Sequence, residues 1–387
     1  VDQALVGLHR DRVLFVDEVQ RHLLVQPGGL VHALEVDVQD DLLSGDFELP
    51  WDGRVIVLRV SADGRHWTMW NDWLGSIPVF HAEIGQGRIA STLEPVTVAA
   101  AGYTPDDFFL PGMVSLLMNG HFISDWTLYK GMKVVPPDSI SDWDENGFRT
   151  WQVWTVAPSQ TRLEAGWDDL VDEMHELSHN AIAEVLKTQP QWILPLSAGL
   201  DSRMIAAVGA DIGADLHAYA WGEPESADVV YSRKIAKALG LPWKRIELCK
   251  DFLACYTPLW ADLFGSSMHF HGMYQMCFLD ALRSVSDAPL MTGYLGDILS
   301  GADVMQYDTG GVIYKNDWYM HWSAGATRAL LKAPIEEALQ AIADEVKKQS
   351  DAIPGAKFPK SLYLGLWSRQ RLFTSFQSTL SSYWRGI

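Results

Sequence analysis

A run of small and acidic residues between a strand-like and a helix-like segment has the composition of a phosphate-binding loop. Its residues are Leu196, Ser197, Ala198, Gly199, Leu200, Asp201 and Ser202. Small side chains let backbone N–H groups approach phosphate oxygens, and the N-terminus of the following helix adds partial positive charge. The two serines can donate hydroxyl hydrogen bonds, and the carboxylate of Asp201 can bind Mg²⁺, which neutralises a polyphosphate. The alternative is an ordinary helix N-terminus, where Asp and Ser are common without a ligand.

A second glycine-rich turn with an acidic residue lies further along the chain, after the strand-like run 289–292. Its candidate site residues are Gly293, Tyr294, Gly296 and Asp297. Two glycine-flanked acidic loops, each placed after a strand, are a more specific signal than either loop alone, because an open parallel sheet binds its ligand beyond the ends of its strands. The alternative for Asp297 is a helix cap within a glycine-rich turn.

Hydrophobic periodicity predicts a β-rich first domain and an α/β second domain. Residues 1–158 contain short strand-like runs, such as 54–60 and 66–70. Residues 159–387 begin with a long amphipathic helix that Pro190 ends. Strands and helices then alternate, which predicts a parallel sheet with helices on both faces. The apolar stripe of the long helix is Leu170, Met174, Leu177, Ala181 and Val185.

The overall composition indicates a soluble globular protein that handles small molecules. The net charge of −19 would repel a phosphate backbone, so nucleic acid is not an expected partner. No apolar run reaches the roughly 18–20 residues that a membrane helix needs, so no membrane partner is expected either. The three cysteines, Cys249, Cys255 and Cys277, fit neither a disulfide framework nor a paired zinc knuckle. We expect buried, reduced thiols and therefore a cytoplasmic protein.

The loop at residues 196–202 resembles the pyrophosphatase loop of the asparagine synthetase family, which belongs to the PP-loop ATP pyrophosphatase superfamily. Ala198 takes the place of the second glycine of that loop. A strand, then Asp228, then a helix follow in the order that the family has, and the turn 292–301 looks like its second signature. The resemblance implies a parallel-sheet α/β PP-loop synthetase domain over residues 159–387, with ATP as a ligand.

By the same resemblance, the two acidic loops form one ATP site. Asp201 and Asp297 would share the Mg²⁺ that bridges the ATP phosphates, and Asp201 is for this reason a catalytic candidate as well. Gly293 and Gly296 would line the nucleotide together with the first loop. The resemblance therefore implies two cofactors, ATP and Mg²⁺.

Tyr294 stands where asparagine synthetases have a glutamate. The sequence around it more closely resembles β-lactam synthetases, in which a tyrosine oriented by a glutamate helps to deprotonate the attacking amine. By that resemblance Tyr294 is a catalytic residue, with Glu336 or Glu337 as its orienting partner; the alternative is that Tyr294 only lines the pocket. The chain ends at Ile387, where family members usually continue, so we expect a truncated C-terminus and cannot place the late lysine of those enzymes.

The first domain resembles the same family. Three runs are similar to its N-terminal nucleophile-type, αββα-like glutaminase domain: 71–80, 87–94 and 127–137. That domain hydrolyses glutamine with an N-terminal cysteine, whereas this chain begins with Val1 and has no cysteine before Cys249. Unless a preceding segment has been removed, we expect residues 1–158 to keep the fold without the glutaminase activity.

Together these features predict an ATP-dependent amidoligase that adenylates a carboxylate with release of pyrophosphate and then forms an amide. Its partners would be a small-molecule carboxylate and an amine or ammonia, and we expect a homodimer as its assembly. Two alternatives stay open: an ammonia-dependent asparagine synthetase, and a nucleotide-binding partner subunit without catalysis. A zinc hydrolase is a third, because residues 175–179 match the H-E-x-x-H pattern, but both histidines lie off the apolar stripe of the helix.

Overall fold

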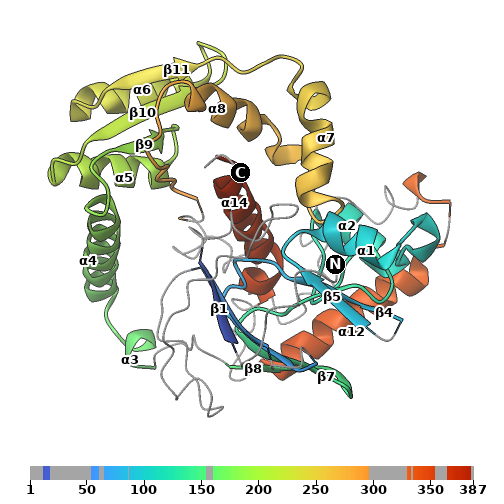
Figure 1. The fold of residues 1–387 in the computed structure, drawn as a ribbon. Coiled ribbons are helices and arrows are strands. Elements are labelled where there is room, and N and C mark those ends of the chain that lie inside the picture. Colours follow the sequence, from blue (N-terminus) through green and yellow to red (C-terminus); the bar gives the residue numbers. More distant parts are fainter. Residues whose placement is uncertain are drawn as a thin grey trace. The chain divides into compact units, whose positions relative to one another are not determined.

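The computed structural model of the chain contains two compact units (Figure 1). The described residues are 12–17, 54–60, 65–85, 87–153, 160–294, 296, 329–332, 334–353 and 364–384. The first unit comprises Val1–Ala157, Leu259–Phe270 and Tyr307–Ile387, and the second comprises Pro158–Pro258 and His271–Gln306. The C-terminal helices thus belong to the same unit as the N-terminal strands. The functional domains proposed from the family resemblance, 1–158 and 159–387, stay a prediction.

Two antiparallel sheets form the framework of the first unit. The five-stranded sheet has the order β1-β2-β3-β7-β8, with bounds β1 (Arg12–Asp17), β2 (Val55–Val60), β3 (Trp67–Asn71), β7 (Ser139–Asp144) and β8 (Gly147–Gln152). The three-stranded sheet has the order β5-β4-β6, with bounds β4 (Phe80–Ile84), β5 (Gly87–Ser91) and β6 (Lys133–Val134). One apolar cluster includes Met69 and Trp143 from the first sheet and Ala90 from the second, so the two sheets share a core.

Helices complete the first unit. They are α1 (Glu94–Ala101), the 3-10 turn η3 (Pro105–Asp107), α2 (Leu110–Asn119), α12 (Glu336–Ala352), the π-helical turn η7 (Leu366–Gln370) and α14 (Arg371–Trp384). Helices α2 and α12 pack together through a buried cluster that includes Val114, Met118 and Ile342. Helices α1 and α2 lie in a region whose sequence pattern predicted β-strands. Pro near the start of each helix, and a glycine in the left-handed region just after each end, are the signals that identify them.

The second unit is built on a parallel sheet, as the alternation of strands and helices predicted. The sheet has the order β11-β10-β9, with bounds β9 (Trp192–Pro195), β10 (Leu216–Trp221) and β11 (Trp243–Ile246). The helices in this part of the chain are α3 (Gln160–Leu163), α4 (Trp167–Leu186), α5 (Leu200–Asp211), α6 (Ala227–Leu239), α7 (Phe252–Phe264), the 3-10 turn η4 (Phe270–Gly272) and α8 (Tyr274–Arg283). Figure 1 shows α6 running beside β10 and β11, where the two crossover helices α5 and α6 also contact each other.

Helix α4 buries a different face from the predicted one. Of the predicted stripe, Met174 is 44% exposed and Leu177 is 53% exposed. The buried residues are Ile182, Ala183 and Leu186, in the last turns of the helix, and they join the core around β9 and α5. Helical spacing identifies which residues share a face, but the packing partner decides which face becomes buried.

The cysteines also differ from expectation. Cys277 is buried, whereas Cys249 and Cys255 are exposed. The expectation of three buried thiols is therefore wrong for two of them. Within the described ranges, no helix is both long enough and apolar enough to cross a membrane.

Candidate functional site: the loop between β9 and α5

The site lies at the edge of the parallel sheet of the second unit, between the end of β9 and the start of α5. Strand β9 pairs with β10 on one side, and on its other side Ile193 forms a parallel bridge with Leu290. The Ile193 backbone donates to the Pro289 oxygen at 2.8 Å and accepts from the Met291 N–H at 2.8 Å. The predicted strand 289–292 is thus reduced to this bridge. Because β9 and the segment at Leu290 run parallel and next to each other, the loops that follow them leave the sheet side by side at the same edge. Open α/β sheets bind ligands at such a point, where the strands on the two sides of β9 lie in opposite directions across the sheet.

The β9 loop, residues 196–199, is ordered by two serines. Ser202 is only 6% exposed, and its Oγ accepts from the Ser197 backbone N–H at 3.2 Å. The two hydroxyl oxygens lie 3.1 Å apart, and the Ser197 Oγ also accepts from the Gly199 N–H at 3.1 Å. Since only one hydroxyl can donate within the pair, the hydrogen of the other remains available for a ligand oxygen.

The first turn of α5 presents backbone donors at the same place. The N-cap is Gly199, which has no side chain to cap the helix. Helix α5 begins at Leu200, which is 73% exposed, so it contributes its backbone rather than its side chain. Leu196 is buried and its N–H donates to the Tyr219 oxygen at 2.8 Å, which anchors the loop to β10. Uncapped N–H groups at a helix N-terminus form an anion-binding site.

The second glycine-rich turn packs directly on this helix turn. A Cβ atom at Gly293 would lie 2.6 Å from the Ser202 backbone nitrogen, and one at Gly296 would lie 2.6 Å from Oδ1 of Asp201. Real Cβ atoms essentially never approach so closely, so both positions require glycine for steric reasons. The structure therefore brings together the two loops that the sequence singled out separately.

The remaining predicted site residues lie partly within and partly outside the described residues. Asp201 is partly exposed in the first turn of α5, and Tyr294 is 37% exposed beside the two glycines. Asp297 follows directly after Gly296 and lies outside the described residues, so its pairing with Asp201 through a metal ion stays a prediction. Glu336 and Glu337 occupy the first turn of α12, in the other unit, and their role beside Tyr294 stays a prediction too.

Two charged residues that the sequence analysis left out of the site hold the peptide at Ala198. Oδ1 of Asp228, in the first turn of α6, accepts from the Ala198 N–H at 2.9 Å. The Arg203 guanidinium donates to the Ala198 oxygen at 2.9 Å. The signal for Asp228 is its place just after the N-cap Ser226, because the first turns of α5 and α6 lie at the same edge of a parallel sheet.

An aromatic group borders the site at the end of β10. The Trp221 ring lies 4.3 Å from the ring of Phe278 and 6.0 Å from that of Tyr274, measured between centroids. Burial raises the pKa of Tyr274, and the negative charge of Asp228 raises it as well. Tyr274 is therefore a neutral phenol whose ring supplies a flat apolar face close to Asp228.

The histidine pair on α4 has its own surroundings. His175 is exposed, and Nε2 of His179 lies 3.3 Å from Oδ2 of Asp211. The centroids of the two imidazole rings are 6.3 Å apart. Within the described part of the chain, no three His, Cys, Asp or Glu side chains are grouped so that they could hold a metal ion.

Comparison with known proteins gives one sequence match and a set of structural matches. Residues 173–351 match the family model described as asparagine synthase. No curated protein matches the chain. Among solved structures 36 chains match, including a glutamine-dependent NAD+ synthetase from Acinetobacter baumannii in complex with adenosine diphosphate, at 14% identity and a TM-score of 0.27. That match covers 63% of this chain and 43% of the other, so this chain spans less than half the length of that protein.

Proposed function

We propose that this chain, whose residues 173–351 match the asparagine synthase family model, is an ATP-dependent carbon–nitrogen ligase that activates a carboxylate by adenylation. The observation that carries the proposal is the direct contact of Gly293 and Gly296 with the first turn of α5. It joins two acidic, glycine-rich loops into one crevice at the switch point of the sheet, where a nucleotide is expected to bind.

The phosphates of ATP are held by the β9 loop and α5. Backbone N–H groups of the first turn and the spare hydroxyl of the Ser197–Ser202 pair donate to phosphate oxygens, and the helix dipole favours their charge. Trp221 and Tyr274 offer aromatic faces to the base. The carbonyl of Ala198 in this loop is already bonded to Arg203, which reduces its repulsion of phosphate.

The residues present also suit a divalent cation. Asp201 supplies carboxylate oxygens, the ligands that Mg²⁺ prefers, at the N-terminus of α5, and Asp297 would be the second ligand. When bound there, Mg²⁺ would neutralise the charge that develops on the departing pyrophosphate. The fixed N–H groups of α5 act on the same charge without reorganisation.

The reaction proceeds in two steps. A carboxylate oxygen of the substrate attacks the α-phosphorus of ATP, the bond to the β-phosphate oxygen breaks, and pyrophosphate leaves. The nitrogen of an amine then attacks the acyl carbon, AMP leaves, and the amine gives up a proton. Tyr294 is the candidate to assist that proton transfer, with Glu336 or Glu337 as its orienting partner; alternatively Tyr294 only lines the pocket, and its exposure of 37% is compatible with both roles.

Pyrophosphate release tests the proposal. The protein is incubated with ATP, Mg²⁺ and a panel of carboxylic acids, and the products are separated to distinguish AMP plus pyrophosphate from ADP plus phosphate. We expect AMP and pyrophosphate with at least one acid, and loss of both in Asp201→Ala. Asp211→Ala is the matched control, because Asp211 ends the same helix α5 and is expected to leave the activity unchanged. Unchanged pyrophosphate release in Asp201→Ala contradicts the site, and formation of ADP contradicts adenylation.

The nitrogen source and the carboxylic acid that the protein accepts identify which kind of ligase it is. With aspartate as the acid and ammonium as the nitrogen donor, formation of asparagine identifies an asparagine synthetase proper. A cyclic amide formed from a substrate that carries both a carboxylate and an amine identifies an intramolecular ligase. Glutamine in place of ammonium tests whether an amidotransferase activity accompanies the ligase.

A further inference from the structure

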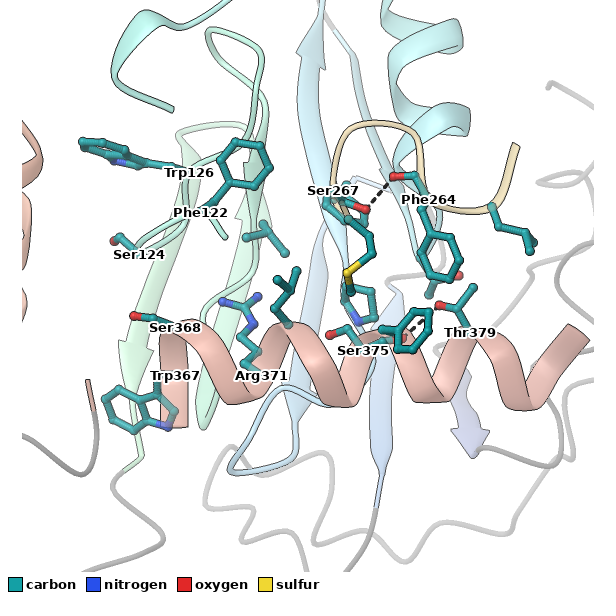
Figure 2. A pocket seen from close by; sticks show the side chains of 18 residues that line it. Phe122, Ser124, Trp126, Phe264, Ser267, Trp367, Ser368, Arg371, Ser375 and Thr379 are labelled. Carbon is teal, nitrogen blue, oxygen red and sulfur yellow. Dashed lines mark hydrogen bonds between the residues drawn. The ribbon is translucent and has the colours of Figure 1, made fainter. Parts of the chain in front are cut away.

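A second pocket lies wholly within the first unit, along one face of α14. Its wall is formed by α14, by the segment 122–126 and by the turn after α7, which carries Ser267 (Figure 2). The cavity measures about 60 Å³, several times the roughly 10–15 Å³ that one water-sized sphere requires. We call it the α14 pocket. It shares no residue with the β9 loop site.

Arg371 is the distinctive residue of the α14 pocket. It is 6% exposed, and burial lowers its pKa to about 10. Its Nη2 donates to the backbone oxygen of Val135, which is the acceptor that Arg371 has among the described residues. A guanidinium carries five N–H donors in a planar fork that fits a carboxylate, so the described residues use only a small part of its hydrogen-bonding capacity.

Two carboxylates act on Arg371 through their charge but do not bond it. Asp125 and Asp72 both raise its pKa. Asp125 is paired with Lys133 at 3.0 Å. Asp72 accepts from the backbone N–H groups of Leu74 at 3.1 Å and Ser76 at 3.1 Å. These carboxylates make Arg371 tolerable as a buried charge, and Figure 2 shows its guanidinium among the side chains that line the cavity.

Two hydroxyls accompany Arg371 on the same helical face. Ser368 and Ser375 are three residues before and four residues after it, the spacing that places side chains one above the other on a helix. Both line the cavity, and in the described part of the chain neither hydroxyl has a hydrogen-bond partner. The hydroxyls of Ser267 and Thr379 instead donate to backbone oxygens. Ser368 and Ser375 therefore add hydroxyl donors to those of Arg371.

Aromatic rings form much of the far end of the pocket, where the hydroxyls of Ser267 and Thr379 are already bonded (Figure 2). Phe264 and Phe376 lie 5.5 Å apart between ring centroids, and Met268 also lines the cavity. A ligand that fits this distribution is polar and anionic at one end and apolar at the other.

We propose that the α14 pocket binds a short-chain organic carboxylate, with its anionic head on Arg371 and Ser375 and its aliphatic tail against Phe264 and Phe376. The small volume restricts the ligand to a few carbon atoms, and the bidentate fit of a guanidinium selects a carboxylate over a neutral amide. The alternative is that Arg371 only orders its own surroundings and is solvated by water in the cavity.

Calorimetric titration of the full chain with butyrate, without ATP, tests this proposal. We expect saturable binding in the millimolar range or tighter, and at least tenfold weaker binding of butyramide, which has the same shape without the charge. Arg371→Met is expected to weaken butyrate binding at least tenfold. Arg149→Met is the matched control, because it removes the same charge from the exposed end of an Arg149–Asp144 pair on β8, and it is expected to leave binding within twofold.

If Arg371→Met does not fold, Ser375→Leu tests carboxylate binding in its place, because this variant keeps the guanidinium and fills the cavity. We expect butyrate binding to be lost in Ser375→Leu and retained in Ser375→Ala within tenfold. The absence of saturable butyrate binding to the unaltered protein overturns the proposal, and so does equal affinity for butyrate and butyramide or unchanged binding in the folded variants. Because the titration contains no ATP, its outcome is independent of the pyrophosphate assay.

Discussion

The β9 loop site and the α14 pocket represent two ways of building a binding site. The β9 loop site uses a nearly contiguous stretch, residues 196–203, with a second turn docked against it. Its donors are mostly backbone N–H groups whose positions follow from a strand that turns into a helix. The α14 pocket draws on segments from residue 78 to residue 379, and its donors are side chains. A site of the first kind is visible in a sequence, and one of the second kind is not.

The two sites also differ in how they are held together. Within the β9 loop site most of the ordering bonds join residues two to five positions apart, such as Gly199 to Ser197 and Ser197 to Ser202, and the longest, from Ala198 to Asp228, spans 30 positions. Around the α14 pocket they span the chain: Arg371 bonds Val135, 236 positions away, and Trp367 donates to the Trp73 oxygen, 294 positions away, at 3.0 Å. The α14 pocket should therefore depend on the global fold of its unit, and the β9 loop site on local geometry.

The largest expected effect is a pH dependence of stability in the unit that holds the α14 pocket. Glu94, in α1, accepts from the backbone N–H groups of Ser266 at 2.5 Å and Ser267 at 2.8 Å. Burial, which outweighs these bonds, raises the pKa of Glu94 from 4.5 to about 7. The folded state thus keeps a proton that the unfolded state loses. Its stabilisation is full below pH 4.5 and disappears as the pH rises through 7, a change of about 3 kcal/mol.

Glu94→Gln isolates the contribution of Glu94 to this pH dependence, since an amide is neutral at every pH and can keep both hydrogen bonds from the backbone. Urea unfolding of both proteins at about pH 5 and about pH 8 should show that the protein with Glu94 loses stability relative to Glu94→Gln as the pH rises. His81 titrates in the opposite sense, because burial lowers its pKa to about 4, and it cancels in the difference between the two proteins. Parallel pH profiles would show that Glu94 ionises normally.

The next effect concerns the contact that joins the two loops of the β9 loop site. Gly293→Ala places a Cβ atom 2.6 Å from the Ser202 nitrogen, and the turn has to move away. Displacement of catalytic groups by about 1 Å costs about 100-fold in rate, so we expect about that loss of pyrophosphate release. Gly166→Ala, at the N-cap of α4 with only the Asp169 carboxylate 3.1 Å away, is the control and should be active. Butyrate binding should survive both changes.

A smaller effect tests whether the two sites are independent, because one variant should lower only pyrophosphate release and the other only butyrate binding. Ser202→Ala removes the acceptor of the Ser197 N–H and breaks the serine pair. We expect about tenfold slower pyrophosphate release from the loss of this buried bond, with butyrate binding unchanged. Arg371→Met should show the converse pattern. If either variant lowers both readouts equally, the two sites are not independent.

The smallest effect is expected at Asp228. Asp228→Asn keeps an oxygen that can accept from the Ala198 N–H, while Asp228→Ala does not. We expect about two- to threefold lower pyrophosphate release in the Asn variant and about tenfold in the Ala variant, since a neutral hydrogen bond contributes about 1 kcal/mol. Equal activities of the two variants would show that the charge of Asp228, rather than its hydrogen bond, matters.

The sequence by itself determined the strand–loop–helix order of the second unit. Apolar runs, the glycine-containing loop before α5 and Gly240 after α6 are local signals, and the strands and helices they predicted between 192 and 283 are present within a few residues. Local patterns succeed here because backbone geometry within one strand or turn depends on neighbouring residues. The family match over residues 173–351 agrees with the resemblance drawn from the same motifs.

Only the tertiary structure decided which surfaces meet. It buried the last turns of α4 instead of the predicted stripe, exposed Cys249 and Cys255, and placed α12 and α14 in the unit of the N-terminal strands. It also enclosed Arg371 in a cavity that no motif marks. Burial is a property of contacts between segments hundreds of residues apart, and a sequence pattern shows only that a face is apolar, not what will cover it.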